Sequence, residues 1–386
     1  MNKKSHRIVL FSLILCLMFF LSMNIFSQDR MPGSQGKKIT VDKESWISPY
    51  KSQGSGGSCS IHSVVSFLES ELYRIAQKKI ELSQLYCHYF SYVEKVQRCL
   101  RYRDGNSFRK GGQFGDVLKV IEKYGAMPYA AYEGTLTKED INNYKELFNE
   151  LLKFGKLLFA KAQKNELNII WKNGAVTNPW LPDLKTILDT HMGIFPETFT
   201  YNGQEYTPKE FAENVLNFNF DDYVKLTSYS YIPFYQPGEL LVRDNWLHDH
   251  EYYNLPVDEY IRAIDHAVNS GYSAAVDIHI TRELYSDSSK NYADFQEDEV
   301  IDQDVRDELF DNWQTSDVHL IHLIGIAHDE SGKKYYVVKD SVGPDQKMHP
   351  PAFYSENYFR GRVLAVMIHK NGIPKNIREK LTWIIH

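Results

Sequence analysis

Acidic residues are absent from the first 27 positions of the chain, and this absence separates the segment from everything that follows. Lys3, Lys4 and Arg7 precede an almost entirely apolar stretch at positions 8–26. This layout is typical of a signal peptide, so we predict that residues 1–27 direct export to the periplasm or the cell exterior. Because about 20 apolar residues can also span a bilayer, retention as an anchor is the alternative to cleavage.

An excess of basic charge is also missing from the chain. Its 386 residues carry a formal net charge of -6, and removing the three cations of the leader takes this to -9. An acidic body offers no electrostatic footprint for nucleic acid, so we expect no nucleic-acid partner, and no membrane contact in the mature form. Repeats and low-complexity linkers are lacking, and 43% of the residues are hydrophobic, which is enough for a large core.

Cysteines are few, and only Cys59, Cys87 and Cys99 follow the leader. An odd number leaves at least one thiol free in an oxidising compartment. Cys87 and Cys99 fall in one predicted helix, where a rise of 1.5 Å per residue places them roughly 18 Å apart, too far for a disulfide. We expect both to be buried apolar residues, which leaves Cys59 as the thiol with unusual surroundings.

The surroundings of Cys59 are a loop of small residues at positions 53–58 and a segment with apolar residues at helical spacing up to Ile75. This pattern places Cys59 at the N-terminus of a helix. Unpaired backbone N–H groups and the helix dipole favour negative charge there, and they lower the pKa of a thiol.

Helical patterns dominate the first part of the chain and strand patterns the last part, which predicts an α+β fold with two halves that meet at a cleft. Further helices are expected at 82–102 and 114–124. A mainly helical insertion is expected at about 135–266, with helices over 139–164, 184–192, 208–216 and 257–269. Strands are expected at 273–280, 319–327, 335–339 and 363–369, with a hairpin turn at 329–332.

A cysteine nucleophile needs a base, a group that orients the base, and donors for the oxyanion. Gln53 lies six residues before Cys59, so its amide can fold over the same point as the Cys59 backbone N–H. His319 begins a predicted strand and Asp340 ends its hairpin partner, so these two side chains are expected to lie side by side.

The sequence motifs around these residues support this interpretation. Four segments resemble, in the same order, sequence motifs of papain-like cysteine peptidases. They are residues 47–53 leading to Cys59, the pair Gly111-Gly112, the tripeptide Tyr132-Glu133-Gly134 and the hairpin 319–343. The long middle region and the ending at 363–375 are similar to the bleomycin hydrolase and aminopeptidase C branch of that family, peptidase C1. The resemblance covers about residues 40–375.

The resemblance implies a papain-like fold of residues 28–386 and a role for each matching residue. Cys59 would be the nucleophile, His319 the general base and acid, Asp340 the orienting group and Gln53 the oxyanion donor, with substrate pairing along Gly111-Gly112. The implied activity is hydrolysis of short peptides with an aminopeptidase preference, without metal or other cofactor. In that family the C-terminal tail enters the cleft and a ring-shaped oligomer encloses it, so a homo-oligomer is an open expectation.

Four residues near the predicted centre differ from the family pattern: Ser60, Leu320, Asp340 and Val342. Asp340 replaces asparagine, yet a carboxylate also accepts the imidazole N–H and favours the imidazolium. The other three replace tryptophan or a small residue. These differences support an alternative, namely a weakened or inactive homologue that binds peptides or serves assembly.

Other histidines offer competing interpretations. His62 lies one helical turn after Cys59 but on the expected buried face, and His322 on the same strand as His319 is the main rival for the base. His248 and His250 suggest a metal-dependent hydrolase, although no second ligand pair accompanies them and a solvated loop is the simpler interpretation.

Overall fold

The computed structural model describes residues 38–54, 56–103, 108–133, 143–168, 170–172, 175–280, 292–295, 301–341 and 352–383. The leader predicted at residues 1–27 lies outside the described residues, as does Val342.

The first half of the described chain is helical. The helix that follows the small-residue loop begins at Cys59, as predicted, because the loop ends there and apolar residues then recur along one face. The next helix begins after Ser83, whose hydroxyl accepts a hydrogen bond from the Tyr86 backbone N–H at 3.1 Å and caps the helix. The bounds are α2 (Cys59–Ala76), α3 (Gln84–Tyr102), α4 (Phe114–Tyr124), α5 (Asn143–Gln163), α6 (Leu181–Met192) and α7 (Pro208–Phe211).

The second half is built on one large sheet with the order β10-β13-β12-β11-β9-β14-β6-β8-β7, to which β1 adds by pairing with β11. The strands are β1 (Ile39–Glu44), β6 (Tyr223–Thr227), β7 (Pro237–Gly238), β8 (Tyr252–Asn254), β9 (Ala274–Ile278), β10 (Tyr292–Ala293), β11 (His319–Asp329), β12 (Lys334–Lys339), β13 (Ala352–Ser355) and β14 (Val363–His369).

Smaller elements complete the two halves. The sheet carries the helices α8 (Val257–Asn269), α10 (Gln303–Asp311), α11 (Glu356–Arg362) and α12 (Lys375–Arg378). The helical side carries the hairpins β2 (Ile170–Lys172) with β3 (Ala175–Thr177), and β4 (Phe199–Tyr201) with β5 (Gln204–Tyr206).

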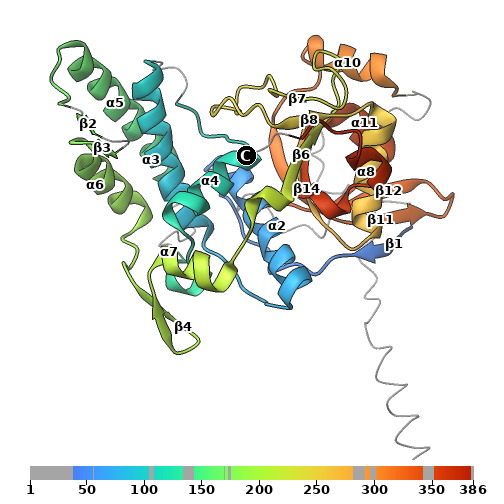
Figure 1. The fold of residues 1–386 in the computed structure, drawn as a ribbon, viewed down its shortest axis with the longest axis horizontal. Coiled ribbons are helices and arrows are strands. Elements are labelled where there is room, and N and C mark those ends of the chain that lie inside the picture. Colours follow the sequence, from blue (N-terminus) through green and yellow to red (C-terminus); the bar gives the residue numbers. More distant parts are fainter. Residues whose placement is uncertain are drawn as a thin grey trace, which may run out of the picture.

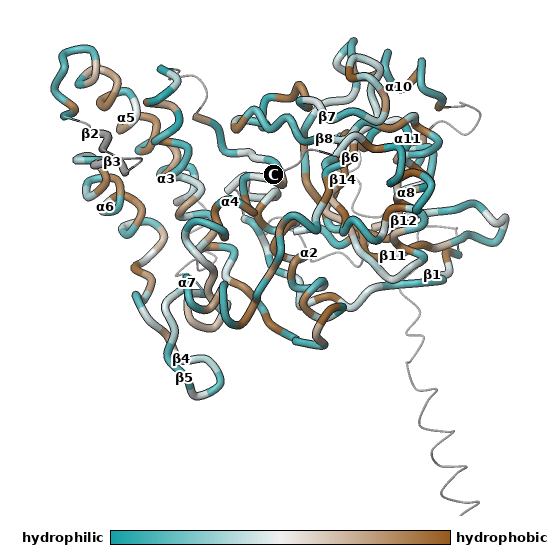
Figure 2. The backbone as a smooth tube through the Cα atoms, viewed as in Figure 1, coloured by the Kyte–Doolittle hydropathy of each residue, from teal (hydrophilic) through white to brown (hydrophobic). Residues whose placement is uncertain are grey.

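Helix α2 joins the two halves. In Figure 1, α3, α5 and α6 lie on one side and the sheet on the other, with α2 and α4 between them. The Ser63 hydroxyl of α2 donates to the Ile321 carbonyl of β11 at 2.6 Å, which ties the thiol-bearing helix to the strand that begins with His319. Figure 2 shows hydrophobic stretches along α2 and in the sheet beside it, while the outer loops are hydrophilic. The site residues are therefore held by a packed junction.

Close approach of two strands explains one glycine of the predicted hairpin. A side-chain carbon added to Gly325 would lie 2.3 Å from the Lys43 carbonyl oxygen of β1, so no larger residue fits without a shift. The hairpin itself is present, since β11 and β12 pair antiparallel around the turn that Asp329 and Gly332 form.

Most predicted elements appear with small changes in their bounds, and α4, α8 and β14 match the predicted residues. Ten of the described strands were not predicted. Seven of them, β2 to β8, lie in the region expected to be a mainly helical insertion, and β6, β7 and β8 pair into the main sheet together with the unpredicted β1, β10 and β13. The boundaries at about 135 and 266 stay predictions.

The three described cysteines are free and buried, as expected for Cys87 and Cys99. Burial, with the nearby charge of Glu69, raises the pKa of Cys87 to about 12, so this thiol stays protonated at neutral pH. In the described residues, no helix is both long enough and apolar enough to cross a bilayer.

Candidate active site

Cys59 opens α2 at the floor of the junction between the two halves. Its side chain keeps 8% of its surface exposed, and the residue belongs to the apolar cluster that also holds Leu320. As the first residue of the helix, Cys59 has a backbone N–H without a partner inside the helix. A thiol at this position combines an apolar setting with free backbone donors.

His319 stands between a carboxylate and the thiol. Its Nε2 lies 2.6 Å from Asp340 Oδ1, and its side chain is hydrogen-bonded to Cys59. Because a carboxylate only accepts, Nε2 carries the proton toward Asp340, which leaves Nδ1 for the thiol. The side chains of His319 and Asp340 are 6% and 17% exposed, so solvent competes little for this bond.

The environment of His319 favours the imidazolium form. Burial alone would lower its pKa, but the charge of Asp340, the Asp340 hydrogen bond and the contact with Cys59 together raise the pKa of His319 well above its usual value. A protonated imidazole beside a thiol is the partner that a reactive thiolate needs.

Ser341, which the sequence interpretation did not include, connects this pair to the predicted oxyanion donor. Its backbone N–H donates to Asp340 Oδ1 at 2.6 Å, and its carbonyl accepts from the Gln53 backbone N–H at 3.0 Å. Its hydroxyl donates to Gln53 Oε1 at 2.8 Å. Because this bond occupies the amide oxygen, the amide nitrogen of Gln53 is left to act as a hydrogen-bond donor. Ser341 directly follows Asp340, and this adjacency was the one signal for it in the sequence.

The predicted substrate strip, Gly111-Gly112, lies before α4, and hydrogen bonds from a buried lysine fix its backbone. Lys95 is buried, and its Nζ donates to the carbonyls of Arg109, Lys110 and Gly111 at 3.1, 2.9 and 2.6 Å. A side-chain carbon on Gly112 would lie 3.3 Å from the Ser60 hydroxyl oxygen, so the strip runs directly past the residue after Cys59. The structure thus brings all six predicted residues to one junction.

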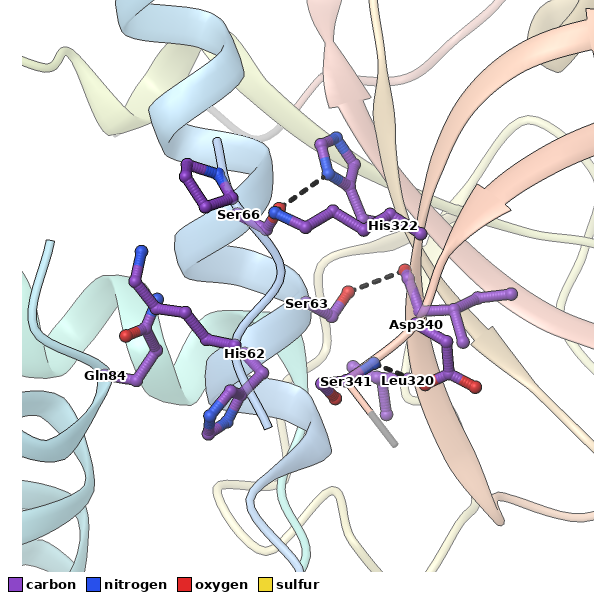
Figure 3. A pocket seen from close by; sticks show the side chains of 12 residues that line it. His62, Ser63, Ser66, Gln84, Leu320, His322, Asp340 and Ser341 are labelled. Atoms are coloured by element: carbon purple, nitrogen blue, oxygen red, sulfur yellow. Dashed lines mark hydrogen bonds between the residues drawn. The ribbon is translucent and has the colours of Figure 1, made fainter. Parts of the chain in front are cut away.

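His322, the rival base, lies in a separate buried cluster. Its Nδ1 lies 3.0 Å from the Ser66 hydroxyl (Figure 3). Lys339 Nζ donates to the same hydroxyl at 2.8 Å. Burial and the charge of Lys339 hold the pKa of His322 well below its usual value. The cavity between Ser66 and Leu320 has a volume of about 20 Å³, which is room for about one water molecule. His322 is therefore neutral and faces another partner.

The remaining histidines also have other partners. His62 is half-buried with Nδ1 3.0 Å from the Ser58 carbonyl oxygen, and burial lowers its pKa to about 4. His248 and His250 lie against Glu239, with nitrogen–oxygen distances of 2.6 and 3.7 Å. In the part of the chain that the structure describes, no group of three His, Cys, Asp or Glu side chains has the arrangement of a metal site.

Two of the residues that differ from the family pattern are buried in the junction. Leu320 is 3% exposed and packs in the apolar cluster with Cys59, and Ser60 is 4% exposed. Leu320 therefore fills the core beneath the site. The third, Asp340, performs the contact expected of the residue it replaces, since it accepts the imidazole N–H.

Comparison with known proteins identifies the family of the chain. A model of the Peptidase C1-like family matches residues 34–384. Aminopeptidase G of Lactobacillus delbrueckii subsp. lactis is 22% identical over 350 residues, which cover 83% of this chain and 77% of that protein. Human bleomycin hydrolase is 22% identical over 219 residues, which cover 47% of this chain and 46% of that protein.

The fold has a relative among solved structures. The crystal structure of PepW from Lactobacillus rhamnosis HN001 superposes with a TM-score of 0.64 at 18% identity, over 88% of this chain and 84% of that one. The predicted α+β, papain-like fold is confirmed.

Proposed function

We propose that this chain, which belongs to the Peptidase C1-like family, is an exported cysteine aminopeptidase that removes residues from the N-terminus of short peptides. The observation that carries the proposal is the placement of His319, with Asp340 at 2.6 Å on one side and the Cys59 thiol on the other. The likeness to aminopeptidase G supports the same reaction class.

The reaction follows from the groups at the junction. The Cys59 thiolate attacks the peptide carbonyl carbon, and the carbonyl oxygen takes up the negative charge. The backbone N–H of Cys59 and the amide of Gln53 stabilise this oxyanion. His319 donates its Nδ1 proton to the departing amine, which leaves a thioester on Cys59. A water molecule, deprotonated by His319, then hydrolyses the thioester and releases the N-terminal residue with a free carboxylate.

Turnover of aminoacyl reporters tests the proposal. The purified mature chain should release a fluorophore from an aminoacyl-coumarin, and Cys59→Ala should abolish this release. Cys99→Ala is the matched control, because Cys99 is a buried thiol on α3 and should leave turnover nearly unchanged. Unchanged turnover in Cys59→Ala contradicts the assignment, and absence of turnover in the natural chain favours the alternative of an inactive, peptide-binding homologue.

Export is the second part of the proposal. Its support is the basic and then apolar segment of residues 1–27. The mass of the protein recovered from the periplasm or the culture medium should lack the leader. A full-length mass in the membrane fraction supports an uncleaved anchor instead. Light scattering of the same material tests whether it assembles as a homo-oligomer.

A further inference from the structure

Lys110 lies between the predicted substrate strip and the loop that leads to the nucleophile. It directly precedes Gly111, and its carbonyl accepts a hydrogen bond from the buried Lys95 at 2.9 Å, which fixes its backbone. A side-chain carbon added to Gly57 would lie 2.8 Å from Lys110 Cβ and 3.2 Å from its Cδ. Gly57 lies two residues before Cys59, so the stem of this lysine runs beside the thiol on the helical side of the junction.

The ammonium group of Lys110 faces an aromatic ring instead of a carboxylate. Its Nζ lies 5.1 Å from the centre of the Phe148 ring, which is half-buried on α5 and stacks on Phe108 at 5.7 Å. Among the described residues, no carboxylate lies at ion-pair distance from this ammonium group. Because a hydrogen bond to a carboxylate is stronger than a contact with a ring face at a half-buried site, Lys110 retains the capacity to bind an anion.

Lys145 is the second cation at this place. It is exposed and lies three residues before Phe148, so the two side chains share one face of α5. Burial and the charge of Lys145 lower the pKa of Lys110, and none of the described acidic groups opposes this shift. Two neighbouring positive charges repel each other, so an anion that contacts both is stabilised.

Tyr144 brings this part of α5 against the nucleophile loop. It is buried, and a side-chain carbon added to Gly56 would lie 3.4 Å from its ring. Tyr144 and Phe148 are four residues apart on α5 and offer apolar surface, while Lys110 and Lys145 supply positive charge. A side chain with a short apolar stem and a terminal carboxylate matches this combination.

We infer that Lys110 and Lys145 receive the side chain of the residue whose carbonyl Cys59 attacks, and that they select glutamate or aspartate there. A substrate main chain that pairs along Gly111-Gly112 presents this side chain next to Lys110, the residue before the strip. In an aminopeptidase the attacked residue is the N-terminal one. This inference rests on the proposed function and deepens it, because it names the substrate class as peptides that begin with an acidic residue.

Two reporters of nearly equal size that differ by one charge test the inference. The natural mature chain should hydrolyse α-glutamyl-coumarin at least about tenfold better, in kcat/KM, than glutaminyl-coumarin at low ionic strength, and added salt should reduce this preference. Lys110→Met keeps the length of the stem and removes the charge, so the preference should fall at least about fivefold, chiefly through KM. Lys145→Met should cause a smaller fall. Equal hydrolysis of the two reporters by the natural chain overturns the inference.

Charge reversal distinguishes recognition of the substrate from support of the fold. Lys110→Glu should make glutaminyl-coumarin the better of the two reporters, because the introduced carboxylate repels the glutamyl side chain. Lys156→Met is the matched control, since Lys156 is exposed on the same face of α5 roughly 16 Å beyond Lys145, and it should keep the natural preference. Equal losses for both reporters in Lys110→Met and Lys110→Glu overturn the inference.

Binding to Cys59→Ala separates this inference from the proposed reaction. Calorimetry should detect binding of glutamyl-alanine amide at least about fivefold tighter than that of glutaminyl-alanine amide, and Lys110→Met in the same background should remove most of this difference. If the natural chain hydrolyses neither reporter, the proposed function fails while this measurement still decides the inference. Equal binding of the two peptides overturns it.

Discussion

The active-site cluster around His319 and the polar cluster around His322 lie on one strand, three residues apart, and both histidines are buried. The pKa of His319 is raised well above its usual value, whereas that of His322 is held well below it. The difference comes from adjacent residues at the end of β12, because Asp340 contacts the first ring while Lys339 lies beside the second. Burial lowers the pKa of both rings, and only at His319 do a carboxylate and a thiol outweigh it and favour the imidazolium.

The largest expected effect comes from replacing each of the two histidines by glutamine in separate variants. His319→Gln should reduce kcat for an aminoacyl reporter by about a hundredfold to ten-thousandfold, because the base and acid of both steps is lost. His322→Gln keeps the size and polarity of a residue that contacts Ser66, and we expect kcat within a few-fold of the natural value. Steady-state kinetics on folded material measures both. Comparable losses in the two variants would remove the distinction between the clusters.

Stability should depend on the second cluster. Glu69 is fully buried, accepts the Leu82 backbone N–H at 2.7 Å and the Ser48 hydroxyl, and faces the cations Lys51 and Lys339. Glu69→Ala leaves these groups without their acceptor, so the free energy of unfolding should fall by about 3–5 kcal/mol. Urea unfolding followed by tryptophan fluorescence measures the change. Glu330→Ala, at an exposed turn, is the control, and an equal midpoint for both variants contradicts the expected role.

A smaller effect is expected at the connection between the clusters and the oxyanion donor. Ser341→Ala removes the hydroxyl that fixes Gln53 Oε1 at 2.8 Å. The loss of one hydrogen bond is worth about 1 kcal/mol, which corresponds to about a fivefold fall in kcat. Gln53→Ala should lower kcat further, and the double variant should resemble Gln53→Ala. Additive losses in the double variant would show that Ser341 does not act through Gln53.

The smallest change is a displacement of the pH profile. The reactive form needs a protonated His319, so activity is lost as pH rises through the raised pKa of this group. Asp340→Asn keeps the hydrogen bond and removes the charge, which lowers the pKa of His319 and moves the alkaline limb of kcat/KM to lower pH. Profiles of the natural protein and Asp340→Asn test this. A limb that stays in place or moves upward contradicts the assigned cause.

Local patterns predicted the helices of the first half, α8 and four strands of the main sheet. The limits of α4, α8 and β14 were readable because caps, apolar periodicity and β-branched runs are properties of neighbouring residues. Strands β6 and β8 were not predicted, since they are short and are stabilised by pairing partners distant in the sequence. Helix α2 was placed correctly because its small-residue loop and apolar face lie within one segment.

Site residues could be predicted only in segments of the sequence that resemble motifs of the family. Gln53, Cys59, His319 and Asp340 lie in such segments, although the catalytic roles stay predictions. Lys95 carries no local signal, because its role depends on the carbonyls of a distant segment that it contacts. Burial decides its chemistry, and the burial of one polar side chain cannot be predicted from its neighbours in the sequence.

The central claim is that Cys59 and His319 form a reactive pair, and the rate of thiol alkylation tests it most directly. The folded mature protein is exposed briefly to limiting iodoacetamide at neutral pH, and peptide mass spectrometry follows Cys59, Cys87 and Cys99. We expect Cys59 to be labelled roughly a hundredfold faster than the other two thiols, and this advantage to disappear in His319→Gln. Equally slow labelling of all three thiols in the natural protein would contradict the claim.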